Sequence, residues 1–294
     1  MNNESEFYKL LKASPGINLG AFENNWTYIV QSTRDNLFIE RSLDSIVYYT
    51  YKDNDSAIIV NSLGPKRKLV VLNLCKKLQK EIKCIIIKNV DLMELDWWIE
   101  NGFSKKNTPW SKYSSMDDNS FAQYNIHKNT VETRDFKEDI KRQIRYFEKN
   151  RNITTVPYEN IYNSEVMKML IDFSKYSENK GNDYASEVVN AHKFFFDDSI
   201  TTKIMLQHME NNKLIGVSFL TPVEDVCFYN MVICGHERNI MKYLVYKSME
   251  FVISKYPTIR LFGMQGSENK GQDYLKKRLN PFESINKIHL IYKG

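Results

Sequence analysis

The stretch Ala57-Ile58-Ile59-Val60-Asn61-Ser62-Leu63-Gly64-Pro65 opens a unit that this chain contains twice. The apolar run predicts a short buried strand, and the Gly-Pro pair predicts the turn that ends it. In both copies the order is strand, glycine turn, helix, strand and a short closing segment. The pieces are 57–61, 66–81, 84–88 and 97–103 in the first copy, and 227–234, 238–255, 259–263 and 272–279 in the second. Because an internal repeat sets the architecture, we expect two related domains.

Further strands are predicted before each copy, over 45–51 in the first half and over 204–209 and 214–221 in the second. Between the last two, the Glu-Asn-Asn-Lys sequence at 210–213 is suited to a hairpin loop, because Asn tolerates left-handed backbone. The first copy closes on Trp97-Trp98-Ile99-Glu100-Asn101-Gly102-Phe103. This order and its aromatic-Gly-Phe ending resemble the Gcn5-related N-acetyltransferase (GNAT) fold. Over roughly residues 20–293, the chain resembles the tandem branch that holds the Fem-type aminoacyl transferases and the phosphatidylglycerol lysyltransferase catalytic domain.

The resemblance implies an α+β fold with mixed, mostly antiparallel sheets, built from two GNAT-like acyltransferase domains in tandem. We expect these domains at 1–115 and 130–294, with the catalytic half in the second, and a polar linker rich in Asp, Asn and Ser over 114–130. A length of 294 residues accommodates two domains of ordinary size. Each half should contain a V-shaped split in its sheet, the first ending near Phe103 and the second near Tyr292.

Composition narrows the class of protein. Hydrophobic residues at 42% and aromatic residues at 13% exclude a disordered chain. No apolar stretch reaches the ~18 residues of a membrane span, and the polar start is unlike a signal peptide, so we expect a cytoplasmic enzyme without a transmembrane segment. The four cysteines form no C-x-x-C pair and are expected to be reduced core residues. The five histidines lack ligand spacing, so no metal is expected.

The two glycine turns bear on the acyl donor. In coenzyme-A-dependent members of the family, bare backbone N–H groups of a glycine-rich turn hold the pyrophosphate at a helix N-terminus. Here Pro65 removes one donor from the first turn, and Glu237 places a carboxylate in the second. Lys66, Arg67 and the following Lys68 crowd the first helix start, where cations oppose the helix dipole unless an anion binds. If no anion binds there, these cations are ordinary surface residues. We expect acetyl-CoA to bind weakly or not at all.

In the tandem branch that this chain resembles, members that lack the pyrophosphate turn use aminoacyl-tRNA as the donor. Aminolysis of its ester needs positioning, a proton acceptor and oxyanion donors. The loop over 266–277 follows a core strand and contains two glycines. From it we take Glu268 and Lys270 as catalytic candidates, and Ser267 and Asn269 as substrate-binding candidates. The alternative is that Ser267 is an N-cap and Glu268 a first-turn carboxylate favoured by the dipole.

Two more candidate regions, a loop and a strand, come from the second half. The polar loop 177–184 contains Asp183 and is expected to form the acceptor-side wall, the alternative being an ordinary loop. Tyr229 and Asn230 lie on the predicted central strand, beside the split where the superfamily binds its acyl donor. We expect Asn230 to bind substrate and Tyr229 to hydrogen-bond the carbonyl under attack, with core packing as the alternative for Tyr229.

A basic helix is predicted at the start of the second domain. Its apolar face repeats at helix spacing through Phe136, Ile140, Ile144 and Phe147. The adjoining face carries the residues that we expect to track tRNA phosphates, together with Lys66 and Arg67 of the first domain. These residues, the basic stripe, are Lys141, Arg142, Arg145 and Lys149. The alternative is a solvated helix face.

The leading hypothesis is therefore an acyltransferase that moves an aminoacyl group from aminoacyl-tRNA to an amine or hydroxyl acceptor, with no cofactor. A coenzyme-A-dependent N-acyltransferase using acetyl-CoA or another acyl-CoA, and a non-catalytic GNAT-like binding protein, are the alternatives. The acceptor is a small molecule, a peptide or a lipid headgroup, and no DNA partner is expected.

Overall fold

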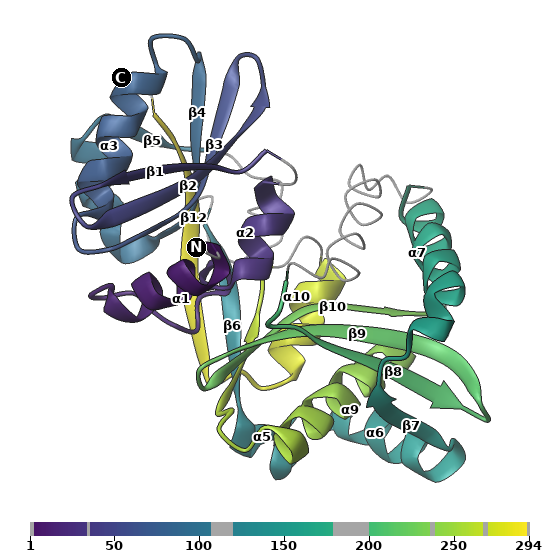
Figure 1. The fold of residues 1–294 in the computed structure, drawn as a ribbon. Coiled ribbons are helices and arrows are strands. Elements are labelled where there is room, and N and C mark those ends of the chain that lie inside the picture. Colours follow the sequence, from purple (N-terminus) through teal and green to yellow (C-terminus); the bar gives the residue numbers. More distant parts are fainter. Residues whose placement is uncertain are drawn as a thin grey trace. The chain divides into compact units, whose positions relative to one another are not determined.

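The computed structural model describes residues 3–33, 36–106, 120–178, 200–235, 239–266 and 270–292, and it is drawn in Figure 1. The chain forms two compact units, each assembled from separate segments. The first contains the described residues of Met1–Tyr124, Gln265–Asp273 and Ser284–Gly294. The second contains those of Asn125–Met264 and Tyr274–Glu283.

The first unit is a sheet with helices, and its strand order is β1-β2-β3-β4-β12, with β5 also paired to β12. Its strands are β1 (Phe38–Ser42), β2 (Ser45–Asp53), β3 (Ser56–Leu63), β4 (Cys84–Asp91), β5 (Phe103–Lys105) and β12 (Glu283–Tyr292). Its helices are α1 (Asn3–Ala13), η1 (Phe22–Asn24), α2 (Trp26–Thr33), α3 (Arg67–Leu78), η2 (Leu92–Glu94) and α4 (Leu95–Glu100). Strand β6 (Phe121–His127) begins in this unit and continues into the second.

The second unit has the strand order β11-β10-β9-β8-β7. Its strands are β7 (Ile153–Pro157), β8 (Ile204–Glu210), β9 (Lys213–Val223), β10 (Val226–Cys234) and β11 (Leu261–Met264). Its helices are α5 (Lys128–Glu132), α6 (Glu138–Asn150), η4 (Asn160–Tyr162), α7 (Asn163–Glu178), α9 (Ile240–Lys255) and α10 (Lys270–Arg278), whose first turn belongs to the first unit.

The repeat predicted from the sequence is confirmed, since each unit contains an antiparallel hairpin that leads into one parallel pair. In the first unit β2 and β3 are antiparallel and β3 is parallel to β4, with α3 as the crossover. In the second, β9 and β10 are antiparallel and β10 is parallel to β11, with α9 as the crossover. Both parallel pairs are short. In the first unit β3 and β4 both continue past their last paired residues, whereas in the second only β10 does, because β11 ends at Met264. The predicted mixed α+β fold is therefore present, and the predicted split is present in the first unit.

The final strand differs from the expectation. We expected the second half to end near Tyr292, but β12 pairs antiparallel with β4 and with β5 of the first unit. Tyr292 packs against Phe103 at a ring-centroid distance of 4.8 Å. This pairing satisfies the backbone donors and acceptors along the edge of β4. Without β12, that edge of an apolar strand would be exposed. The first unit therefore depends on the end of the chain.

Each unit has its own apolar core. In the first, Val71 and Leu74 of α3 pack over the sheet with Trp98 and Leu290. In the second, Val166 and Leu170 of α7 cover Phe219 and its neighbours on β9 and β10. Cys75 belongs to the first core and Cys227 is also buried, whereas Cys84 and Cys234 are partly buried, so only two of the four cysteines are core residues as expected.

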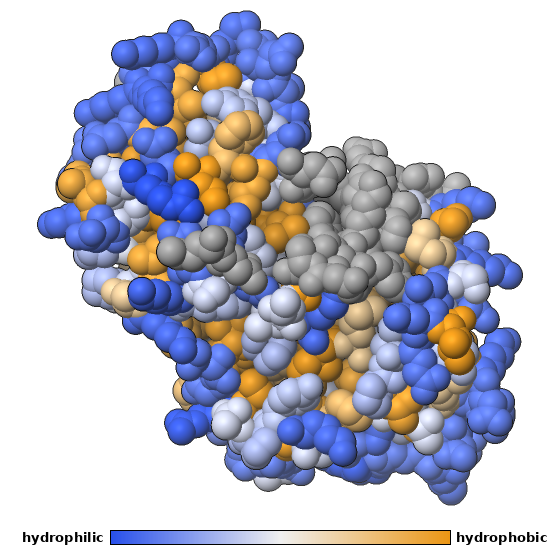
Figure 2. Space-filling view, in the orientation of Figure 1, coloured by the Kyte–Doolittle hydropathy of each residue, from blue (hydrophilic) through white to orange (hydrophobic). Residues whose placement is uncertain are grey.

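The visible surface of both units is mostly hydrophilic, with hydrophobic residues in small groups (Figure 2). Among the described residues, no helix is long and apolar enough to cross a membrane.

Candidate functional site

Strands β3 and β4 are paired only from Ser56–Cys84 to Ile59–Ile87 and separate beyond that point. The separation opens a cavity of about 240 Å³ in the first unit. Its walls come from β3, β4, the chain around η1, the start of α3 and β12. The lining side chains with polar or charged groups are Asn18, Glu23, Asn24, Asn61, Ser62, Arg67, Lys88, Asn89, Asp91, Glu94, Trp98 and Lys287.

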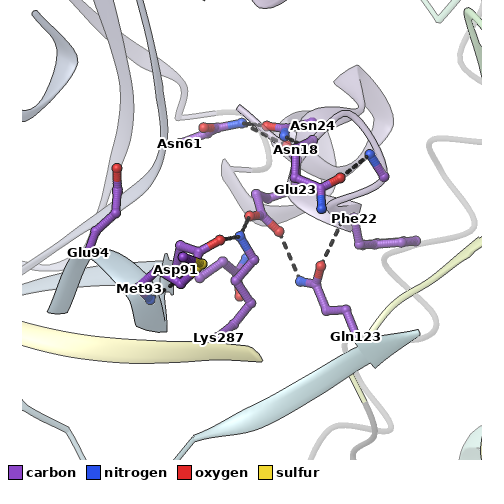
Figure 3. A network of polar contacts seen from close by, with 12 residues as sticks. Asn18, Phe22, Glu23, Asn24, Asn61, Asp91, Met93, Glu94, Gln123 and Lys287 are labelled. Atoms are coloured by element: carbon purple, nitrogen blue, oxygen red, sulfur yellow. Dashed lines mark hydrogen bonds and ion pairs between the residues drawn. The ribbon is translucent and has the colours of Figure 1, made fainter. Parts of the chain in front are cut away.

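Lys287 of β12 joins two carboxylates in this cavity (Figure 3). Its Nζ lies 2.8 Å from Oε1 of Glu23 and 3.6 Å from Oδ2 of Asp91. The side chains of Lys287 and Glu23 are only 5% and 8% exposed, so this ion pair is buried. Burial alone would lower the pKa of Lys287, but the charge and hydrogen bond of Glu23 and the charge of Asp91 outweigh it and raise this pKa above its ordinary value. Lys287 is therefore a fixed cation at the cavity wall.

Amide side chains hold Glu23 and its backbone in place (Figure 3). Gln123 donates from Nε2 to Oε2 of Glu23 at 2.9 Å, and its Oε1 accepts from the backbone N–H of Phe22 at 2.9 Å. Asn61 of β3 donates to the backbone carbonyl of Glu23 at 2.8 Å and to Oδ1 of Asn24 at 3.2 Å. The segment around η1 is thus tied to β3 and β6, and Glu23 is oriented toward Lys287.

At the start of α3, two of the three cations, Arg67 and Lys68, are paired with Glu94. Arg67 donates two hydrogen bonds to Glu94, at 2.6 and 3.1 Å. Lys68 lies 3.7 Å from the same carboxylate and its Nζ is 5.1 Å from the ring centroid of Trp97. Burial alone would raise the pKa of Glu94, but the hydrogen bond and charge of Arg67 hold it below its ordinary value. Glu94 therefore supplies the anion that the crowded cations at this helix start require.

The turn before α3 has few free backbone donors. The N–H of Gly64 donates to Oγ of Ser14 at 2.6 Å, and that of Lys66 donates to Oγ of Ser45 at 2.8 Å. Gly64 has φ +104°, and a Cβ built on it would lie 2.5 Å from the backbone oxygen of Asp44. The glycine is therefore needed for close packing against the β1–β2 turn. With Pro65 between these residues, the backbone here is occupied by protein contacts and not arranged as a phosphate cradle.

In the second unit, Asn230 of β10 lies just past the end of the parallel pairing with β11. Their parallel pairing ends at Tyr229 and Met264. On the other side of β10, the register with β9 shifts between Tyr229 and Met231, so Asn230 is the bulged residue. Bulges re-aim side chains and occur next to functional sites. Nδ2 of Asn230 donates to Oγ1 of Thr221 at 2.7 Å, and its buried Oδ1 has no hydrogen-bond partner among the described residues.

Tyr229 lies in a buried polar network of the same unit. Its hydroxyl is 3.0 Å from Oγ of Ser218 and 3.2 Å from Oγ of Ser248. His208 joins this network through Nε2, 2.8 Å from Ser218. Burial, with a smaller contribution from the charge of Lys247, lowers the pKa of His208 to about 3, so the imidazole is neutral. The hydroxyl of Tyr229 is thus engaged in the core, which matches the packing alternative for this residue.

The basic stripe lies on α6 as the sequence pattern predicts. Ile140, Ile144 and Phe147 are buried, and the ring of Phe147 stacks on Tyr243 of α9 at 5.2 Å. Arg142, Arg145 and Lys149 are exposed, whereas Lys141 is partly buried. Arg145 is paired with Glu138 on the surface. The structure therefore presents the stripe to solvent but leaves its role in phosphate binding a prediction.

Several predicted site residues lie outside the part that the structure describes. They are Asp183, Ser267, Glu268 and Asn269. Lys270 begins α10, but its side chain is also outside the described part, as is Glu237 of the second turn. The loop around 266–270 thus stays a prediction. Within the described residues, no group of three His, Cys, Asp or Glu side chains is placed to hold a metal ion.

Sequence reasoning missed the charged cavity of the first unit. Glu23 and Lys287 are 264 positions apart and belong to no motif, so no spacing could have paired them. One signal was present: Lys287 lies within a strand whose apolar residues Ile285, Ile288, Leu290 and Ile291 predict that it is buried. A lysine inside a buried strand needs an acidic partner.

Comparison of the whole structure with solved structures gives matches over nearly the full chain. A conserved protein of unknown function from Bacteroides thetaiotaomicron is 12% identical, with a TM-score of 0.73, covering 99% of this chain and 97% of that one. The C-terminal domain of a putative lysylphosphatidylglycerol synthetase from Agrobacterium fabrum is 10% identical, with a TM-score of 0.64, covering 99% and 92%. A tandem GNAT protein from the clavulanic acid biosynthesis pathway is 11% identical, with a TM-score of 0.58, covering 99% and 95%.

FemX also matches, at 10% identity and a TM-score of 0.61, over 98% of this chain and 95% of that one. The resemblance to the tandem GNAT, Fem-type and lysylphosphatidylglycerol synthetase structures is therefore confirmed at the level of fold. No protein-family model matches the sequence. The search of curated proteins by sequence likewise finds no match.

Proposed function

We propose that this protein is an acyltransferase that moves an aminoacyl group from aminoacyl-tRNA to an amine or hydroxyl acceptor. The observation that carries the proposal concerns Asn230, a bulged residue with a buried amide oxygen, which lies just past the end of the β10–β11 pairing. A carbonyl oxygen accepts hydrogen bonds from N–H groups and not from other carbonyls. It is therefore suited to the ammonium group of an aminoacyl ester or to an attacking amine.

In the proposed reaction the acceptor amine attacks the ester carbonyl carbon, and a C–N bond replaces the C–O bond to the tRNA ribose. The amine loses one proton, and the departing ribose oxygen gains one. Asn230 orients the amine, Glu268 accepts the proton, and Lys270 stabilises the negative charge that develops on the carbonyl oxygen. A hydroxyl acceptor would follow the same course and give an ester.

One further observation supports an aminoacyl donor over acyl-CoA. The N–H groups of Gly64 and Lys66 are bonded to serine hydroxyls, so the first turn lacks the donors that pyrophosphate binding uses. The comparable folds do not distinguish the two donors, because they include a lysylphosphatidylglycerol synthetase domain, FemX and a tandem GNAT protein. The donor must therefore be decided by experiment.

A thermal-shift series with the full chain tests the donor, because a ligand that binds only the native state raises the unfolding midpoint. We expect a rise with aminoacyl-tRNA, a smaller rise with uncharged tRNA and none with acetyl-CoA. A rise with acetyl-CoA alone would replace this proposal by the coenzyme-A-dependent one. No rise with any donor would leave a binding protein that retains the fold.

Transfer assays with the responding donor then test the residues. Asn230→Ala should reduce the transfer rate by about tenfold or more, the cost of one hydrogen bond to a charged group. Gln143→Ala is a matched control, because Gln143 also has a buried amide oxygen without a partner among the described residues but lies on α6. Glu268→Ala and Lys270→Ala should reduce turnover more than stability. Equal rates for Asn230→Ala and the parent protein would remove the observation on which the proposal rests.

The basic stripe makes a separate contribution to the proposal. Each phosphate contact changes the slope of log affinity against log salt by roughly 0.7 to 0.9. Replacing Arg145 and Lys149 by Gln should therefore reduce the slope for tRNA by about one to two units. Lys213→Gln with Lys255→Gln, two charge losses on other elements of the unit, provides the control. An unchanged slope would assign the stripe to the solvated surface.

A further inference from the structure

The cavity of the first unit has a balanced set of charges. Three carboxylates line it, from Glu23, Asp91 and Glu94, and three cations, from Arg67, Lys88 and Lys287. Several of these are tied to one another, Lys287 to Glu23 and Arg67 to Glu94. Such a lining disfavours a ligand with a large charge of one sign, because a phosphate or a polyamine would face as many like charges as opposite ones.

Asp91 is the carboxylate nearest to solvent in the group around Lys287. Its side chain is 31% exposed, against 8% for Glu23. One oxygen, Oδ1, accepts from the backbone N–H of Met93 at 3.0 Å, and the other is 3.6 Å from Lys287 Nζ. That second contact is long for a charge-assisted hydrogen bond. Asp91 therefore has acceptor capacity that a ligand ammonium group can use.

Trp98 of α4 lines the same cavity and has a donor without a partner among the described residues. The residue lines the cavity and is 2% exposed. Its indole Nε1 is buried and has no hydrogen-bond acceptor among the described residues. A buried Trp N–H normally finds a partner, and leaving it without one costs free energy. The acceptor that it lacks can be supplied by a ligand oxygen, since the indole N–H only donates.

From these features we propose that this cavity binds a free α-amino acid as its zwitterion, with the ammonium group at Asp91 and a carboxylate oxygen at Trp98. A volume of about 240 Å³ is ample for several water molecules, and we infer that it accommodates a small or medium amino acid. The zwitterion matches the balanced charges, and its two ends match the spare acceptor and the spare donor. The inference concerns binding and is independent of the transfer reaction proposed above.

Calorimetric titration of the full chain with the common amino acids, each paired with its N-acetyl and amide derivatives, tests this binding. We expect at least one amino acid to bind while both of its derivatives bind at least tenfold more weakly, because each lacks one of the two charges. Trp98→Phe removes the N–H and retains an aromatic ring, and should weaken binding about tenfold. Trp97→Phe is the matched control, because the neighbouring indole does not line this cavity, and should bind as the parent does.

Three results would overturn the inference: no amino acid binds at millimolar concentration, the derivatives bind as tightly as the parent amino acid, or Trp98→Phe binds as tightly as Trp97→Phe. If Trp98→Phe does not fold, the affinity of Asp91→Asn for the amino acid tests the inference instead. Asn can still accept from Met93 but lacks the charge for an ammonium group, so unchanged affinity in this variant would also overturn the inference. Because no transfer is measured, failure here would leave the proposed acyltransferase activity untouched, and the converse also holds.

Discussion

Replacing Lys287 by Met is the sharpest test of the charged cavity in the first unit. The variant keeps an unbranched side chain that is one atom shorter but leaves Glu23 buried, with the amide of Gln123 as its remaining donor. A buried ion that loses its partner costs about 3–5 kcal/mol. Because Lys287 is 5% exposed and Glu23 8% exposed, the charge left on Glu23 is poorly solvated, and we expect the loss of stability to fall in this range.

Glu23→Gln should cost less, about 1–3 kcal/mol, because Asp91 still lies 3.6 Å from Lys287. The double variant removes both buried charges. We expect it to be more stable than the sum of the single changes predicts, since neither ion is then left unpaired. Lys83→Met is the control, because its ion pair with Asp55 is 80% and 60% exposed and should contribute at most about 1 kcal/mol.

Urea unfolding at neutral pH, followed by tryptophan fluorescence, measures these costs. All four tryptophans, Trp26, Trp97, Trp98 and Trp110, precede residue 124, so the signal reports on the first part of the chain. Lys287 has a raised pKa in the folded protein, so its contribution is fully present below the ordinary value of 10.5 and is lost as pH rises through the folded value. A cost below about 1 kcal/mol for Lys287→Met, or strictly additive single changes, would refute the reasoning.

Three other predictions concern single groups. Glu94→Gln should cost about 1 kcal/mol of stability at neutral pH. The pKa of Glu94 is lowered in the folded protein, so its contribution is present above about pH 4.5 and is lost as pH falls through the folded value. The variant should therefore lose less stability in acid than the parent, and unfolding at several pH values would contradict this if both proteins showed the same dependence on pH. Gly64→Ala should cost about 1–3 kcal/mol because of its positive φ and the contact with Asp44, and an unchanged melting temperature would contradict this. Tyr229→Phe should cost about 1 kcal/mol of stability while leaving the transfer rate unchanged, and a large rate loss at unchanged stability would return Tyr229 to the catalytic candidates.

The sequence by itself was sufficient to predict the repeated strand–turn–helix–strand architecture. The apolar runs at 57–61 and 84–88 became the parallel strands β3 and β4, and the amphipathic pattern of α6 placed Ile144 in the core and Arg145 on the surface. These features follow from local periodicity, because strand and helix geometry decide which neighbours share a face. The same local logic predicted that Pro65 would weaken a phosphate cradle at the first turn.

Tertiary structure alone decided the partners of the polar groups. Arg67 and Lys68, which the sequence suggested for an external anion, meet Glu94 from a different element. The hydroxyl of Tyr229 meets two buried serines, and Lys287 at the end of the chain meets Glu23 near its start. Such pairs depend on which strands are neighbours in a sheet and on the pairing of β12 with β4. A local pattern cannot encode them, because hydrogen bonds and ion pairs act over a few ångströms in space and are indifferent to separation along the chain.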